Sequence, residues 1–167
     1  MIWRKCKTTG EQPSKSSEFR RFLKNLSLEK RHSHRSVIFQ DKLYVFGGYL
    51  ISDSRNTNDL FVLDPEELHW ERINPQGFEP GPMRGMCLQE YKGKMYLFGG
   101  HDEDTYSNES FVYDIGENKW DKVETKNKPP PIRTNHTGVL YDDGLVIWGG
   151  VNTDEYFSTI YYLDLSK

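Results

Sequence analysis

The chain of 167 residues has room for one ordinary domain, and its 14% aromatic content supplies side chains for a core. Its cysteines, Cys6 and Cys87, form neither a CxxC pair nor a disulfide framework, which argues against a structural zinc site and favours a cytoplasmic location, with a nuclear one left open. No apolar run reaches the length of a signal peptide or of a membrane span, so we expect no membrane partner.

Positive charge is concentrated at the beginning of the chain. Residues 1–35 contain ten Lys or Arg and three Glu, which is a net charge of +7 and leaves −10 for the rest of a chain whose total is −3. A basic arm of this kind can dock on the acidic body, on an acidic partner, or weakly on nucleic acid. We expect proteins rather than nucleic acid as partners.

The first thirty residues are predicted to contain a short strand and a short helix. Trp3–Lys7 resembles two later segments that begin at Trp70 and Trp120, so residues 1–13 are interpreted as an isolated fourth strand with its linker. Residues 14–30 form a basic insertion. Its apolar residues follow the spacing of a short amphipathic helix that packs on the fold: Phe19, Phe22, Leu23 and Leu26.

Three units of similar pattern follow, over residues 31–73, 84–123 and 133–167. Each unit has an arginine, a first strand, a tight turn, an apolar second strand that ends in two glycines, a polar loop, and a third strand that ends in aspartate. A fourth strand with a tryptophan closes the first two units. The recurring residues are Gly47, Gly48, Gly99, Gly100, Gly149, Gly150, Asp64, Asp114, Asp164, Trp70 and Trp120.

The apolar second strands, residues 43–46, 95–98 and 145–148, predict how the units pack. A strand with one wet face would alternate polar and apolar residues, whereas these are apolar at nearly every position. We therefore expect each to be covered on both faces by neighbouring units. The paired glycines allow backbone angles that are closed to other residues, and no Gly-Lys-Ser/Thr motif indicates phosphate binding.

This pattern resembles the Kelch repeat, whose period is about fifty residues. The usual tyrosine before the aspartate is present as Tyr113 but replaced by Leu63 and Leu163, and the third unit has no tryptophan. The resemblance implies an all-β fold in which each unit is a four-stranded antiparallel blade of a β-propeller. The chain would then form a partial propeller of about three blades with a short N-terminal helical insertion.

A closed propeller needs about four to eight blades, and an open arc leaves an apolar blade face bare at each end. Two interpretations follow. Two chains can associate head to tail, so that Trp3–Lys7 of each completes the last blade of the other and a six-bladed ring results. Alternatively, the sequence is a fragment or a truncated copy of a longer Kelch protein.

The resemblance implies that the long loops on one propeller face carry the binding surface. Polar loops with aromatic residues on a rigid scaffold are typical of recognition surfaces. The candidate partner-binding residues in these loops are Tyr49, Arg55, His101, Tyr106 and Tyr156.

Arg31, Arg84 and Arg133 recur before the first strand of each unit. They are candidates to receive an acidic peptide, or they satisfy carbonyl groups of the scaffold. His34 and His136 follow two of these arginines at the same offset, with Cys87 at that place in the second unit. No carboxylate accompanies the histidines at a repeated spacing, so we expect no metal site.

These observations favour a protein–protein interaction module, an adaptor or scaffold with no catalytic activity and no cofactor. The alternative is a sugar-modifying, mutarotase-like Kelch enzyme or one similar to the plant specifier proteins. In the specifier iron motif Glu-x-x-x-Asp-x-x-x-His, Glu117 and Asp121 fit, but Thr125 stands at the histidine position.

Overall fold

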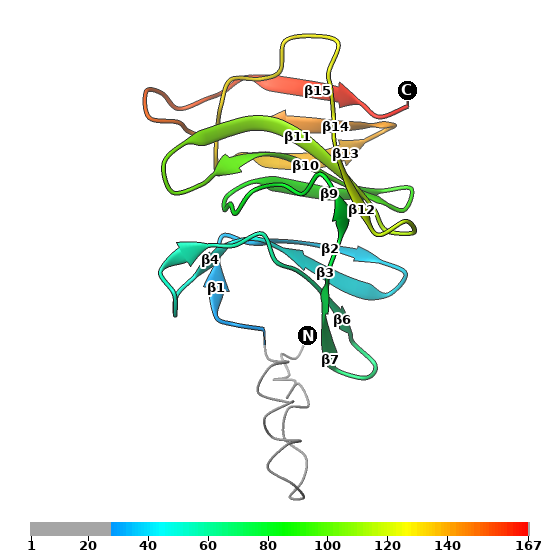
Figure 1. The fold of residues 1–167 in the computed structure, drawn as a ribbon. Coiled ribbons are helices and arrows are strands. Elements are labelled where there is room, and N and C mark those ends of the chain that lie inside the picture. Colours follow the sequence, from blue (N-terminus) through cyan, green and yellow to red (C-terminus); the bar gives the residue numbers. More distant parts are fainter. Residues whose placement is uncertain (1–27, 167) are drawn as a thin grey trace, which may run out of the picture.

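The computed structural model describes residues 28–166, which fold as strands in four small sheets (Figure 1). The first large sheet, blade 1, is antiparallel, and its four strands lie side by side in chain order. They are β2 (Arg35–Phe39), β3 (Lys42–Phe46), β6 (Leu60–Asp64) and β7 (His69–Ile73). The predicted unit 31–73 thus contains a four-stranded blade.

Blades 2 and 3 repeat this arrangement. Blade 2 consists of β9 (Cys87–Tyr91), β10 (Lys94–His101), β11 (Tyr106–Asp114) and β12 (Lys119–Lys122), with β8 (Gln76–Gly77) added in parallel to β12. Blade 3 consists of β13 (Thr137–Tyr141), β14 (Gly144–Trp148) and β15 (Ile160–Asp164). A small fourth sheet contains β1 (Arg31–His32), β4 (Tyr49–Leu50) and β5 (Arg55–Asn56).

The prediction of an all-β fold built of propeller blades is confirmed by this architecture. The predicted strand at Trp3–Lys7 lies outside the described residues, as does nearly all of the predicted helical insertion at 14–30. Residues 28–166 contain no helix long and apolar enough to cross a membrane.

The core lies between successive blades rather than inside any one of them. Between blades 1 and 2, Phe46 and Leu60 pack against Leu97 and Trp120, all four at most 1% exposed. A smaller cluster between blades 2 and 3 contains Cys87, Phe98, Leu145 and Ile147. Burying each large apolar side chain contributes about 1.5–3 kcal/mol, so each blade depends on its neighbour for stability.

The glycine pairs are the points where one blade touches the segment that leads into the next. The Gly48 amide donates a hydrogen bond to the Met83 carbonyl at 2.9 Å, and the Gly100 amide donates to the Arg133 carbonyl at 2.9 Å. Gly47 has a φ of +66°, and a Cβ added there would lie 2.8 Å from the Met83 carbonyl oxygen. Only glycine permits both this backbone angle and this close approach.

The second glycine pair does not end its strand as the sequence predicted. β10 continues through it to His101, with a shift of register between Phe98 and Gly100. The predicted loop 101–107 is therefore reduced to residues 102–105, because His101 pairs with Tyr106. A bulge allows a strand to bend and continue where a regular ladder would be interrupted.

The recurring aspartates stabilise the turns after each third strand. The side chain of Asp64 accepts a hydrogen bond from the Glu66 amide at 3.0 Å, and that of Asp114 accepts one from the Glu117 amide at 3.0 Å. Backbone donors lower the pKa of both carboxyl groups. This local hydrogen bonding is typical of Asx turns. It explains why an aspartate recurs at this place in the repeat, with no need for a role in binding another protein.

Candidate functional site

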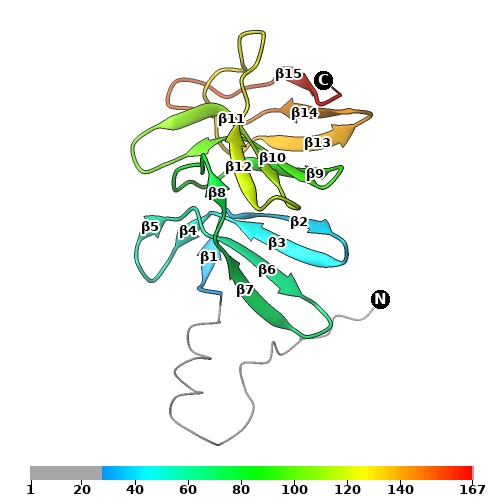
Figure 2. The ribbon, with the colours of Figure 1, turned by 45° about the vertical axis from the view of Figure 1, so that its right-hand side comes forward.

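Three connections lie on the same side of the blade arc (Figures 1 and 2). They are the β4–β5 hairpin, the β10–β11 turn and the segment between β14 and β15. In the latter two, one side chain caps a tight turn: Asp102 accepts the Thr105 amide, and Asn152 accepts the Glu155 amide at 2.9 Å. The side predicted to carry the binding surface is thus formed by loops with defined conformations.

Four of the predicted residues meet on this side in one continuous row. The guanidinium carbon of Arg84 lies 4.9 Å from the centre of the Tyr49 ring, and the rings of His101 and Tyr106 have centroids 4.6 Å apart. Arg84 and His101 are joined by two backbone hydrogen bonds of 3.0 and 2.9 Å. The row therefore runs from the small fourth sheet, which contains Tyr49 in β4, to the β10–β11 hairpin of blade 2.

Two further residues, absent from the sequence prediction, complete this row. Asn56 is 2% exposed; its side-chain oxygen accepts from Arg84 at 3.4 Å, and its amide donates to the His101 carbonyl at 3.4 Å. The ring of His32 packs at a tilt against that of Tyr49, with centroids 5.2 Å apart. We call the six residues the loop-face cluster: His32, Tyr49, Asn56, Arg84, His101 and Tyr106.

Within the loop-face cluster, the surroundings of His101 favour its neutral imidazole form. Partial burial, and secondarily the charge of Arg84, lower the pKa of His101. A neutral imidazole can donate one hydrogen bond and accept another. The cluster therefore combines one permanent positive charge with aromatic faces and neutral polar groups.

Arg55 and Tyr156 stand apart from the cluster. Arg55 pairs with the nearby Asp53 at 3.3 Å, and both side chains are largely exposed. Tyr156 is 89% exposed and belongs to the β14–β15 connection of blade 3. The structure thus groups four of the predicted loop and arginine residues and leaves these two as separate surface positions.

Arg31 and Arg133 are placed inside the scaffold. Arg133 is fully buried and donates from Nη1 to the Gly149 carbonyl at 2.9 Å, and Arg31 donates to the Gly47 carbonyl at 3.1 Å. The guanidinium of Arg133 lies 4.0 Å from the centre of the Phe157 ring. Burial lowers the pKa of both arginines. Each holds the glycine pair of its own blade.

The strand register corrects the predicted recurrence of arginine. The Met83 carbonyl receives the Gly48 amide just as the Arg133 carbonyl receives the Gly100 amide, so Met83 is the counterpart of Arg133. Arg84 pairs with His101 as Thr134 pairs with Val151 and His32 with Tyr49. The first hairpins of the three blades have the same length. Arg84 therefore stands one residue after the scaffold position, which Met83 occupies, and its side chain is half-buried on the loop face.

The same shift changes the predicted histidine position. A Cβ on Gly48 would touch His34 Cβ at 2.9 Å, one on Gly150 would touch His136 Cβ at 2.9 Å, and one on Gly100 would touch Met86 Cβ at 3.1 Å. Met86, and not Cys87, is therefore the counterpart of the two histidines. Within residues 28–166, no three His, Cys, Asp or Glu side chains gather in a metal-binding arrangement.

Comparison with known proteins places the chain in a family. A model of the KLHDC2/KLHL20/DRC7 Kelch-repeats domain matches residues 33–167. Tip elongation aberrant protein 1 of Schizosaccharomyces pombe is 29% identical over 138 residues, which cover 78% of this chain and 12% of that protein. Kelch repeat-containing protein 2 of Saccharomyces cerevisiae is 35% identical over 133 residues, which cover 72% and 15%.

Kelch domain-containing protein 2 of Bos taurus is 26% identical over 190 residues, which cover 98% of this chain and 43% of that protein. The chain thus spans less than half the length of each of these three relatives. The match to the domain model extends over the three blades and includes the glycine pairs, the turn aspartates and Trp120. The chain belongs to the Kelch-repeat family.

Proposed function

We propose that the chain is a non-catalytic protein-binding module, an adaptor or scaffold, which contacts its partner through the loop-face cluster. One observation supports this most directly. No carboxylate among the described residues pairs with Arg84, whereas Arg31, Arg55 and Arg72 each have an aspartate partner. A guanidinium without an ionic partner, held against an aromatic ring, is well suited to receive a carboxylate.

The cluster is also organised before any partner arrives. Arg84 is held by its two backbone bonds to His101 and by the side chain of Asn56, so binding costs little conformational entropy. Tyr49 and Tyr106 flank it with large, amphipathic rings, the type of side chain that contributes most to protein interfaces. We therefore propose a partner segment that carries Asp or Glu beside an apolar residue.

A second copy of the chain is a further proposed partner, through a different surface. Blade 3 turns a row of large apolar side chains outward, of which Ile160 is 70% and Trp148 is 54% exposed. The corresponding residues of blade 1, Leu60 and Phe46, are buried against blade 2. An apolar surface of this kind supports association with another blade.

The loop-face proposal can be tested before the partner is identified. A random peptide library displayed on phage is selected on the whole chain, on Arg84→Gln and on Arg72→Gln. We expect acidic sequences to be enriched by the unsubstituted chain and by Arg72→Gln, a control that removes an exposed guanidinium paired with Asp59. Arg84→Gln should lose that enrichment.

Two results would contradict the proposal. One is equal enrichment of acidic peptides by Arg84→Gln. The other is saturable mutarotation of a sugar by the chain that Arg84→Gln abolishes, since this would assign the cluster to an enzyme.

A further inference from the structure

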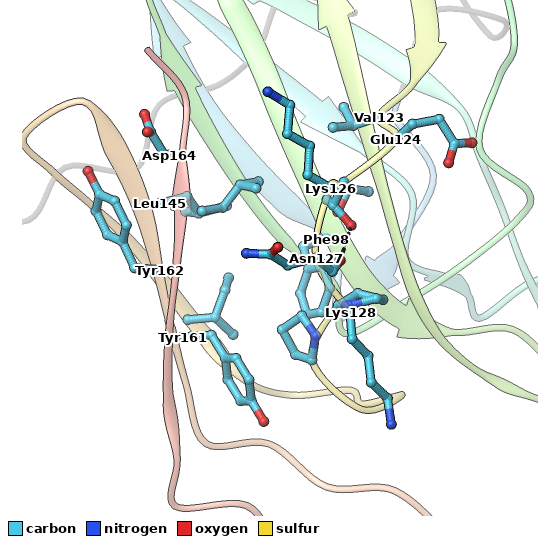
Figure 3. A pocket seen from close by; sticks show the side chains of 16 residues that line it. Phe98, Val123, Glu124, Lys126, Asn127, Lys128, Leu145, Tyr161, Tyr162 and Asp164 are labelled. Atoms are coloured by element: carbon cyan, nitrogen blue, oxygen red, sulfur yellow. Dashed lines mark hydrogen bonds between the residues drawn. The ribbon is translucent and has the colours of Figure 1, made fainter. Parts of the chain in front are cut away.

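Arg31 and Arg133 are held in blades 1 and 3 by matching contacts. Each donates from Nη1 to the first glycine carbonyl of its own blade, at 3.1 and 2.9 Å, and from Nε to the carbonyl two residues earlier, at 3.4 and 3.1 Å. The guanidinium carbon lies 5.3 Å from the centre of the Phe61 ring in blade 1 and 5.1 Å from that of Tyr161 in blade 3. Tyr161 belongs to β15 and lines the space between that strand and the linker over residues 123–130 (Figure 3).

The remaining nitrogen of each guanidinium, Nη2, has different surroundings in the two blades. In blade 1 it lies 3.7 Å from a carboxylate oxygen of Asp59, although the side chain of Arg31 is only 2% exposed. In blade 3, Nη2 of Arg133 is buried and has no hydrogen-bond partner in the described part of the chain. Burial lowers the pKa of Arg133, and the nearby Tyr161 and Glu155 offset this only in part. A buried charge without a partner is costly, so a negative group at this point would stabilise blade 3.

The residue that carries the negative group in the other blades is replaced in blade 3. In each blade the last residue before the glycine pair faces one position on the third strand: Leu60, Ser110 and Ile160. The residue directly before this position is Asp59 in blade 1, Glu109 in blade 2 and Thr159 in blade 3. Glu109 also forms an ion pair, with Lys122. An exposed threonine hydroxyl therefore stands where two blades have a paired carboxylate.

We propose that Thr159 is a phosphorylation site, at which a phosphate group takes the place of the carboxylates of Asp59 and Glu109. A protein kinase transfers the γ-phosphoryl group of ATP to Thr159 Oγ1: the new O–P bond forms, the bond to ADP breaks, and the hydroxyl proton is released. The phosphate carries a charge of about −1.5 to −2 and three acceptor oxygens. It pairs with Arg133 as Asp59 pairs with Arg31.

The neighbouring hydroxyl group, on Ser158, does not fit this role although it is also exposed. Its counterparts are Asn58 and Asn108, whose side-chain amides donate to proline carbonyls of the following linkers at 3.2 and 3.1 Å. This position therefore faces an acceptor, and a phosphate there would meet a carbonyl oxygen without a donor between them. Ser158 is thus the matched control for Thr159.

Phosphorylation of Thr159 would affect the loop face. Thr159 ends the connection between β14 and β15, in which Val151 pairs with Tyr156 and the ring of Phe157 lies 4.0 Å from the guanidinium carbon of Arg133. A phosphate bound to Arg133 would fasten the end of this connection to the scaffold. The inference goes beyond the proposed binding of acidic segments and does not depend on it.

Aspartate at position 159 tests the charge pairing without a kinase. Thr159→Asp should lower the equilibrium constant for unfolding in urea at pH 7 about tenfold, because it gives a buried guanidinium an anionic acceptor. Ser158→Asp should give no such gain, and neither should Thr159→Asp in a chain that also carries Arg133→Met. No gain in Thr159→Asp, or a gain that persists with Arg133→Met, would overturn the pairing.

The modification itself is measured on the protein isolated from its own cells with phosphatase inhibitors present. Fragmentation of the tryptic peptide that begins at Thr134 should locate a phosphate on Thr159. Phosphatase treatment should then raise the equilibrium constant for unfolding about tenfold, back to that of the unmodified chain. Phosphate on Ser158 alone, or a fully sequenced peptide without phosphate, would overturn the assignment. Neither result affects peptide selection through Arg84, which tests the loop-face proposal separately.

Discussion

Met86 and His136 occupy equivalent positions in successive blades, and each side chain lies against the first glycine of the preceding blade. A Cβ on Gly47 would lie 2.7 Å from Met86 Cε, and one on Gly99 would lie 2.8 Å from His136 Cε1. Both side chains are buried, at 0% and 2% exposure. One scaffold position thus holds an apolar residue in blade 2 and a titratable one in blade 3.

This difference predicts a pH-dependent stability. Burial, and secondarily the charge of Arg133, lower the pKa of His136 from 6.5 to about 4. Between these values the unfolded chain binds a proton that the folded chain does not, so stability is greatest above pH 6.5 and falls as the pH drops toward 4. The loss is about 1.4 kcal/mol per pH unit and on the order of 3 kcal/mol in total, measured by urea unfolding at several pH values.

His136→Met is the matched variant, because Met86 shows that methionine fits this position. We expect it to fold and to lose most of the dependence between pH 6.5 and 4. His34 and His101, whose pKa values burial also lowers, contribute with the same sign and remain in the variant. An unchanged slope in His136→Met would disprove the assignment to His136.

Gly47→Ala is expected to destabilise the chain by about 1–3 kcal/mol. The added Cβ would be forced into a left-handed conformation at φ +66° and against the Met83 carbonyl oxygen at 2.8 Å. Gly81→Ala is the control, since nothing lies within 4 Å of a Cβ there. Equal unfolding free energies for the two variants would show that the contact between blades at Gly47 carries no constraint.

Trp120→Ala should cost about 3–5 kcal/mol, because it removes a side chain 1% exposed from the contact between blades 1 and 2. Thermal unfolding provides the measurement. Tyr156→Ala removes an aromatic side chain that is 89% exposed and should change the free energy of unfolding by less than about 0.5 kcal/mol. If both variants lost a similar free energy of unfolding, the conclusion that the core lies between the blades would be contradicted.

The strands were predictable from sequence because apolar runs, glycine pairs and turn aspartates repeat with nearly constant spacing. The equivalence of the three arginines was predicted wrongly. Arg31 and Arg133 precede the first glycine of their own blade by 16 residues, whereas Arg84 precedes Gly99 by 15. That single residue decides whether an arginine supports the scaffold or lies on the surface.

The loop-face cluster was predictable only in part. In the sequence, Tyr49, His101 and Tyr106 fall within predicted polar loops, where aromatic or titratable side chains suggest a binding surface. In the structure they belong to β4, β10 and β11 and are half-buried. Asn56 was missed because its role depends on contacts across two blades, with the Arg84 side chain and the His101 carbonyl, which no local pattern reveals. Its burial among the ends of strands is a property of the tertiary fold.

The position that Arg133 occupies in blade 3 is occupied by Met83 in blade 2, and this difference gives a final prediction. Arg133→Ala should cost about 2–4 kcal/mol, because it leaves a cavity and deprives the Gly149 and Pro131 carbonyls of their donor. Arg133→Met should lose less than half as much, since Met83 occupies the same position in blade 2 and is 6% exposed there. Both are compared by urea unfolding at pH 7. A methionine variant as unstable as the alanine variant would mean that the hydrogen bonds of Arg133, rather than its packing against Phe157 and Tyr161, hold blade 3 in place.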